Sequence, residues 1–164
     1  MRSISHSVEI NSPKTAVWDI LADIGSVAIW APTVDHPVTT NDIEPVVGCE
    51  RACDISGFGK VTERVEAWDE GQSLTIGIDS IGPMKSAHST FDLSEHEGRT
   101  IVPMTIRFDT RFGPIGALIG ATIMRRRLSQ QSAVALAGLK QYAETGRPIT
   151  TQNDLAAETL TAVA

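Results

Sequence analysis

The stretch that decides the fold is GPIGALIGATIMRRRLSQQSAVALAGLKQYAETGRP, residues 113–148. A helix is predicted over about 115–145, because Gly146 and Pro148 are typical of a helix end and apolar residues recur at helical spacing. They form one stripe: Met124, Leu128, Ala135, Leu139 and Tyr142. So long a helix needs another element to bury this stripe.

The residues before this helix predict a meander of seven strands. The first is 3–10, where polar and apolar residues alternate, and the others are 34–40, 49–55, 60–68, 73–79, 85–93 and 100–110. Links between successive strands after residue 34 are short, which favours antiparallel pairing. In the last run one face carries Val102, Met104, Ile106 and Phe108. Pro103 has no N–H to donate, which predicts a bulge or an unpaired edge there.

Two short helices are expected between the first and second strands. Ser12 is a suitable N-cap with Pro13 at the first helical position, and Gly25 is suited to end that helix. Ser26 then begins a second helix through Trp30. The predicted fold class is therefore α+β, an antiparallel sheet of about seven strands wrapped around a long C-terminal helix. Small side chains along that helix, at Ala117, Ala121 and Ser132, leave room for a pocket.

Length and charge narrow the classes of function. The chain has 164 residues, which favours one domain, and a formal net charge of −6. An acidic chain with only 5% aromatic residues argues against general nucleic-acid binding, which needs clustered cations. Apolar runs fall short of the ~20 residues that a transmembrane helix needs, and the N-terminus does not resemble a signal peptide, so a cytoplasmic location is expected.

Cys49 and Cys53 lie four residues apart on one predicted strand, about 13 Å from each other at ~3.3 Å per residue. A disulfide needs Cα atoms within ~7 Å, so two reduced, buried thiols are expected. The histidines have no zinc-site spacing, and neither a metal nor a cofactor is predicted. Arg125-Arg126-Arg127 is interpreted either as a solvated helix face or as a contact for an anionic group.

Four segments carry a family resemblance: SVEINSPKTAVWDILADIGSVAIWAPTV, GCERACD, VTERVEAWDEGQSLTIGI and LKQYAETGRPI. They resemble the START-like (SRPBCC) helix-grip superfamily, which includes polyketide cyclase/dehydrase and lipid-transport proteins. The resemblance covers about residues 3–148. It implies one helix-grip domain over 1–148, followed by a tail over 149–164 in which 154–163 is predicted as a short helix.

The resemblance also implies a cavity between the concave face of the sheet and the long helix. Carried onto this sequence, its lining comprises Trp30, Arg51, Cys53, Glu63, Ile76, Phe91, Met104, Ile106, Phe108, Met124 and Leu128. By strand alternation Arg51 shares a face with the two cysteines, and Glu63 shares one with Val61 and Val65. The two charges either point inward as a buried ion pair or lie solvated on the convex face.

The function favoured by the resemblance is binding or transport of a small hydrophobic ligand, such as a lipid, polyketide, isoprenoid or aromatic molecule. The alternative is an enzyme like a polyketide cyclase or aromatase that acts in the same cavity. A paired arginine and glutamate suit orientation of a ligand better than proton transfer, which favours binding. An interaction module that uses the outer face of the long helix is a third, lower-ranked interpretation.

That outer face carries Ile115, Leu118, Ile119 and Ile123, which lie opposite the small residues of the helix. Four large aliphatic residues are rarely left exposed together in a monomer. This apolar face could be covered by the tail through Leu155, Leu160 and Val163, by strand loops, or by a second copy of the chain in a homodimer. The tail is ranked slightly ahead of the other two.

Overall fold

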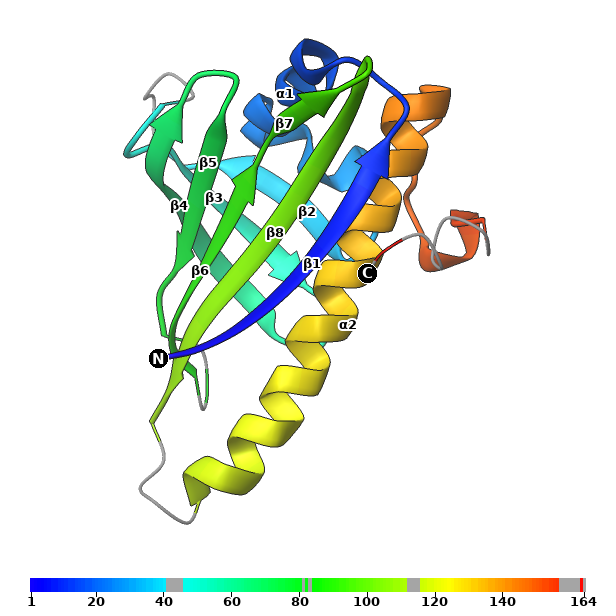
Figure 1. Cartoon of the computed structure of the whole chain (residues 1–164). Helices are drawn as coiled ribbons and strands as arrows, with labels where there is room; N and C mark the ends of the chain where they lie inside the picture. Colours follow the sequence, from blue (N-terminus) through cyan, green and yellow to red (C-terminus); the bar gives the residue numbers. More distant parts are fainter. Residues whose placement is uncertain (41–45, 81, 83, 112–115, 157–162, 164) are drawn as a thin grey trace.

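A computed structural model describes residues 1–40, 46–80, 82, 84–111, 116–156 and 163, with only the backbone over 116–121. The elements are β1 Arg2–Ile10, α1 Lys14–Ala22, the 3-10 helix η1 Ile24–Ile29, β2 Val34–Thr39, β3 Glu50–Ile55, β4 Gly59–Asp69, β5 Ser73–Ile78, β6 Met84–Asp92, β7 Ser94–His96, β8 Arg99–Thr110, α2 Gly116–Thr145 and the 3-10 helix η2 Gln152–Asp154. Figure 1 shows the curved sheet lying along one side of α2.

The strands form one antiparallel sheet in the order β1-β8-β6-β5-β4-β3-β2, with β7 paired to β8. The predicted α+β helix-grip class is confirmed, and the seven predicted strands are all present. The three-residue β7 is an eighth strand that the sequence did not predict, because it falls in the short link expected between the strands 85–93 and 100–110.

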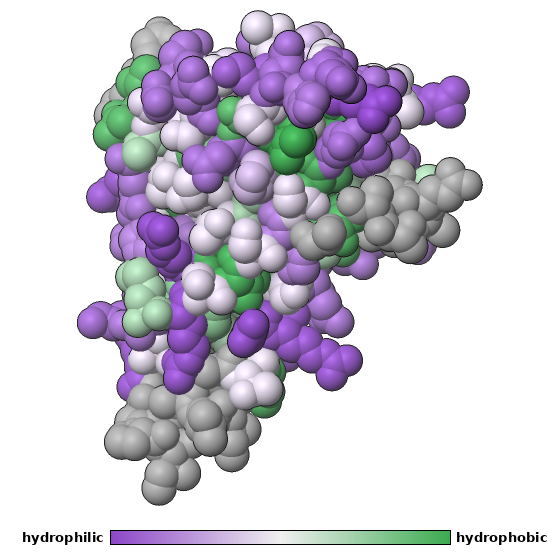
Figure 2. Space-filling view, in the orientation of Figure 1, coloured by the Kyte–Doolittle hydropathy of each residue, from purple (hydrophilic) through white to green (hydrophobic). Residues whose placement is uncertain are grey.

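Alternation along the strands separates the core from the solvent. On β8 every second residue is buried, and the buried set contains Val102, Met104, Ile106 and Phe108. These side chains join those of α1, η1 and α2 in one hydrophobic core. Figure 2 shows the face turned toward the viewer mostly in purple and white, with smaller apolar areas between. The long helix thus buries its stripe against the inner face of the sheet, as its spacing requires.

Pro103 sits in this sheet without a bulge toward β1. Its Cα stays in register with Ser7, and pairing on that side is continuous along β1. On the other side, β8 pairs with β6 as far as Met104 and resumes with β7 at Ile101. The missing N–H of Pro103 therefore lies beside the break that separates β6 from β7, so the expected bulge is wrong and the expected gap in pairing is present.

The start of α1 differs from the prediction. Pro13 takes the N-cap position without a side-chain capping bond, and the Lys14 N–H donates to Glu95 Oε2 of β7 at 2.9 Å. Ser12 is therefore not the cap. A carboxylate from a distant strand satisfies this end of the helix and suits its positive dipole. The end of α1 also differs, because the helix stops at Ala22 and Gly25 lies inside η1.

The tail packs on the last part of α2. The Ile149 N–H donates to the Ile29 carbonyl at 2.7 Å, and Ile149 and Leu155 bury their side chains with Ala137. Ile123 lies 14 residues earlier, about 21 Å along the helix, and is 55% exposed. The prediction that the tail covers this face of the helix is therefore wrong for Ile123.

The other members of that predicted face, Ile115 and the side chains of Leu118 and Ile119, lie outside the described residues, as do the side chains of Ala117 and Ala121. Of the predicted tail helix, 157–162 lies outside them too, and η2 is the helical turn that the described part contains. The homodimer stays a prediction.

Gly138 sets how closely α2 approaches the segment after η1. A Cβ at this position would overlap the Trp30 carbonyl oxygen and would lie 3.1 Å from Pro32 Cδ. The obstacle is mainly backbone, which cannot rotate away as a side chain can. A glycine in the middle of a helix, normally unfavourable, is required here by this close contact.

We expect Gly138→Ala to lower the free energy of unfolding by about 2 kcal/mol, because overpacking outweighs the ~1 kcal/mol that alanine gains in helix propensity. Urea unfolding followed by circular dichroism measures the change. Gly25→Ala is the matched control, since a Cβ there meets no atom closer than 3.7 Å. Equal stability of the Gly138→Ala and wild-type proteins would contradict the close contact.

Candidate functional site

A pocket of about 100 Å³ lies between the inner face of the sheet and α2, beneath η1. Eight of the side chains that the sequence predicted as ligand-binding line it: Trp30, Arg51, Glu63, Ile76, Phe91, Met104, Ile106 and Leu128. They come from β3, β4, β5, β6, β8, α2 and the residue after η1. The curvature of the sheet therefore brings together residues that are far apart in the sequence.

Three predicted residues do not line this pocket: Cys53, Phe108 and Met124. Phe108 is completely buried and Met124 is 6% exposed, and both are packed in the main hydrophobic core. The pocket instead lies where the facing side chains are short, at Ser89 on β6 and Ser132 and Ala135 on α2.

Twelve further residues line the pocket and were not among the predicted ligand-binding residues, although Ser132 was predicted to leave room for a pocket. They come from η1 and the segment after it, from the strands and the β3–β4 turn, and from α2: Val27, Ala31, Thr33, Val34, Ile55, Phe58, Ile78, Met84, Ser89, Gln131, Ser132 and Ala135. On α2 the lining residues are 128, 131, 132 and 135, which is the spacing of one helix face. Two polar residues on a face turned toward the sheet were a usable signal for this site.

The Arg51–Glu63 pair forms the polar part of the wall. These residues are direct partners in the β3–β4 register, and Arg51 Nε donates to Glu63 Oε2 at 2.6 Å. Arg51 is 5% and Glu63 8% exposed. The inward orientation is confirmed, and the alternative of two solvated charges is wrong.

Each charge of this pair has a second partner. Arg51 Nη1 donates to the Ile24 carbonyl at 2.7 Å, and the Cys53 thiol donates to Glu63 Oε2 at 3.4 Å. Removing two ions from water is unfavourable unless the remaining polar atoms also find partners, and these bonds supply them. The pair thereby connects two strands of the sheet to the first residue of η1.

Burial raises the pKa of the Cys53 thiol from 9.0 to about 12, with a further increase from the negative charge of Glu63 that the charge of Arg51 only partly offsets. The thiol therefore stays protonated at neutral pH. A thiolate is the reactive form of cysteine, so Cys53 acts here as a hydrogen-bond donor and not as a nucleophile. Cys49 is also buried, and both cysteines are free.

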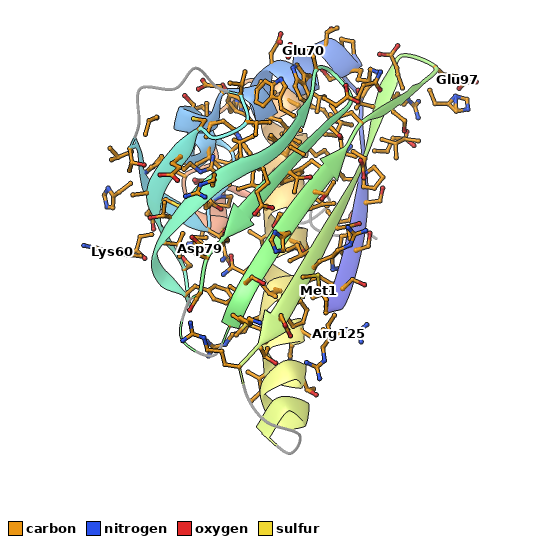
Figure 3. All side chains as sticks on the ribbon, turned by 90° about the vertical axis from the view of Figure 1, so that its left-hand side faces the viewer. Met1, Lys60, Glu70, Asp79, Glu97 and Arg125 are labelled. Atoms are coloured by element: carbon orange, nitrogen blue, oxygen red, sulfur yellow. The ribbon has the colours of Figure 1, made fainter. Side chains whose placement is uncertain are left out.

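The described residues do not gather three or more histidine, cysteine, aspartate or glutamate side chains at a point that could hold a metal ion. Within the same residues, no helix combines the length and apolarity needed to cross a membrane. Arg125, Arg126 and Arg127 are all exposed, and Figure 3 shows Arg125 at the edge of the molecule, beside α2. Arg127 Nη1 lies 3.3 Å from the Gly57 carbonyl in the β3–β4 turn.

We expect Arg51→Met to lower the free energy of unfolding by about 3–5 kcal/mol, because it leaves Glu63 charged, buried and unpaired. Combining it with Glu63→Leu should recover most of this loss, since no buried charge then remains. Urea unfolding of both variants checks the difference. Arg64→Met is the control, because Arg64 pairs with Glu50 on the exposed face and its side chain is 59% exposed. A double variant as unstable as Arg51→Met would contradict the pair as the cause.

The raised pKa of Cys53 predicts a loss of stability in alkali. Between about pH 9 and 12 the folded protein keeps this proton while the unfolded thiol loses it, so the free energy of unfolding falls as pH rises through this window. Below pH 9 the contribution of Cys53 is constant. Urea unfolding at about pH 8 to 11 should show wild type losing stability faster than Cys53→Ala. Parallel curves for the two proteins would contradict the raised pKa.

Comparisons with known proteins agree with this arrangement. The sequence model of the family described as polyketide cyclase / dehydrase and lipid transport matches residues 1–144. No curated protein matches the chain.

Solved structures share the fold at low sequence identity. TTHA0849 from Thermus thermophilus has a TM-score of 0.72 and 14% identity, over 87% of this chain and 97% of that one. XoxI from Bacillus cereus has a TM-score of 0.69 and 19% identity, over 86% and 94%. Ara h 8.0201 has a TM-score of 0.67 and 12% identity, over 87% and 97%. Because the family model matches most of this chain, the chain belongs to the polyketide cyclase/dehydrase and lipid transport family, which is of the SRPBCC type.

Proposed function

We propose that this protein binds a small hydrophobic molecule in the pocket between α2 and the sheet, and carries it without changing it. The observation that supports this is the composition of the wall. Most of its side chains are aliphatic or aromatic, among them Ile76, Phe91 and Ile106, and few are polar. Sites for small molecules typically combine a mainly apolar lining with a few polar groups that fix orientation.

The size of the pocket favours a compact ligand over a long lipid chain. At about 100 Å³ it is smaller than the ~300–1,000 Å³ typical of sites for drug-sized molecules. An apolar cavity of ~150 Å³ in another protein holds one benzene molecule. The pocket therefore suits a ligand no larger than a single aromatic ring or a short isoprenoid unit, among the lipids, polyketides, isoprenoids and aromatics that the sequence predicts.

The chemistry of the wall favours carriage over cyclase or aromatase activity. General acid–base catalysis needs a group that can exchange a proton near neutral pH. Glu63 accepts hydrogen bonds from Arg51 and Cys53, and the Cys53 thiol stays protonated because its pKa is about 12. These groups are suited to holding a fixed polar environment around a ligand.

Filling the pocket should prevent binding. Ala135→Phe places a ring beside Leu128 and Ser132 in a pocket of about 100 Å³, and we expect at least a tenfold weaker affinity for an apolar fluorescent probe, with circular dichroism unchanged. Arg125→Phe is the control, because it adds the same ring on an exposed position of the same helix. Equal affinities in wild type and Ala135→Phe would contradict binding at this site.

Native mass spectrometry of the purified protein separates carriage from catalysis. A co-purified apolar molecule that is released unchanged from wild type, and is missing from Ala135→Phe, supports carriage. Turnover of an aromatic ester or a polyketide mimic, lost on the same substitution, would overturn carriage in favour of the enzyme.

A further inference from the structure

Two buried polar atoms in the pocket wall have no hydrogen-bond partner among the described residues. They are Nε1 of Trp30, a donor, and Oε1 of Gln131, an acceptor. Both residues line the pocket. Buried polar groups in folded proteins are normally paired, so two unpaired groups of opposite kind in one small pocket call for a partner.

Trp30 differs from the other two tryptophans in this respect. The indole N–H groups of Trp18 and Trp68 both donate to the carboxylate of Glu70, at 3.2 and 2.7 Å. Figure 3 shows Glu70 at the end of the sheet where α1 lies. Trp30 is 5% exposed, and its backbone is held against Gly138. Trp30 is therefore a buried residue of the pocket wall whose indole N–H has no partner among the described residues.

The orientation of the Gln131 amide follows from its other hydrogen bond. Nε2 donates to the Ser56 carbonyl at 2.6 Å. Turning the amide over would place its oxygen against that carbonyl oxygen, so the assignment of oxygen and nitrogen is fixed by its partner. Oε1 is then a buried acceptor without a partner among the described residues, on a residue that lines the pocket three positions along α2 from Leu128.

We propose that the ligand carries a hydroxyl group that accepts from Trp30 Nε1 and donates to Gln131 Oε1. This inference rests on the proposed function and specifies its ligand as a phenol or an alcohol of about one-ring size. A hydroxyl supplies both a donor and an acceptor at one atom. A carboxylate lacks the proton that Gln131 needs, and an ammonium lacks the acceptor that Trp30 needs.

The rest of the wall is consistent with an uncharged ligand. Arg51 and Glu63 neutralise each other, and Arg51 has a further bond to the Ile24 carbonyl. Ser132 Oγ donates to the Ser129 carbonyl at 3.0 Å. The pocket thus offers no excess charge to pair with an ionised ligand, and the fully buried polar atoms of its described lining that lack a partner are one donor and one acceptor.

The probes are p-cresol and p-xylene, which have nearly the same size and differ by a hydroxyl in place of a methyl. We expect wild type to bind p-cresol about tenfold more tightly in calorimetric titrations, from two hydrogen bonds of ordinary strength. One indole N–H resonance should shift on adding p-cresol and should be missing from Trp30→Phe.

Trp30→Phe and Gln131→Met each remove one partner and should reverse the preference, because the hydroxyl then enters an apolar pocket incompletely paired. The ratio of the two affinities is compared within each variant, so changes in pocket shape affect both probes alike. Trp18→Phe is the control and should keep the wild-type ratio, since its N–H bonds to Glu70. If one variant does not fold, the other still gives the ratio.

The outcomes separate the two proposals. Binding of p-xylene as tightly as p-cresol to wild type would overturn the hydroxyl site, with a bridging water sufficing for both atoms, and would leave the carrier function standing. A preference for p-cresol that survives both substitutions would also overturn this site. Binding of neither probe would overturn the hydroxyl site, and if wild type also co-purifies with no apolar molecule, the carrier function is overturned with it.

Discussion

The placement of η1 is the constraint on which the pocket depends, and three contacts fix it. Arg51 donates to the carbonyl of Ile24 at its first residue, and the Ile149 N–H donates to the carbonyl of Ile29 at its last. The Trp30 carbonyl that follows rests against Gly138 of α2. A short 3-10 helix has little stability of its own, so these contacts from β3, the tail and α2 hold it over the pocket.

The buried ion pair illustrates how a polar group can be retained in such a wall. Arg51 and Glu63 meet within the sheet, and their remaining polar atoms bond to Ile24 and Cys53. In proteins generally, a well-packed apolar pair often contributes about as much stability as a buried ion pair, which means that stability alone does not explain the charges. The charges fix the position of η1 relative to the sheet, because the Arg51 guanidinium donates a directional hydrogen bond to η1 that a methyl group cannot make.

Much of the fold was predictable from the sequence, because strand alternation and helical spacing are local properties. The same alternation grouped Arg51 with the two cysteines and Glu63 with Val61 and Val65, but it left open whether these faces point inward. The structure shows that they do, and β3 and β4, as neighbouring strands, bring the two charges together. The level of the pocket along α2 was not predictable, since it depends on which long side chains meet across the core. Met124 and Phe108 are packed in the main core and do not line the pocket, whereas the short side chains of Ser89 and Ser132 do. The hydrogen bond from Lys14 at the start of α1 to Glu95 was not predictable for the same reason, because the two residues lie 81 positions apart in the sequence.

The polar atoms of the wall are arranged for selection by hydrogen bonding more than by charge. An apolar pocket alone discriminates weakly between molecules of similar shape, whereas a buried donor and acceptor left unpaired penalise every molecule that cannot satisfy both. Gln131 also bonds to the Ser56 carbonyl, so the acceptor is held in place by the β3–β4 turn. Trp30 is held by Gly138. Both groups are thus positioned by contacts outside the pocket, which is the condition under which a hydrogen-bonding site can distinguish a hydroxyl from a methyl.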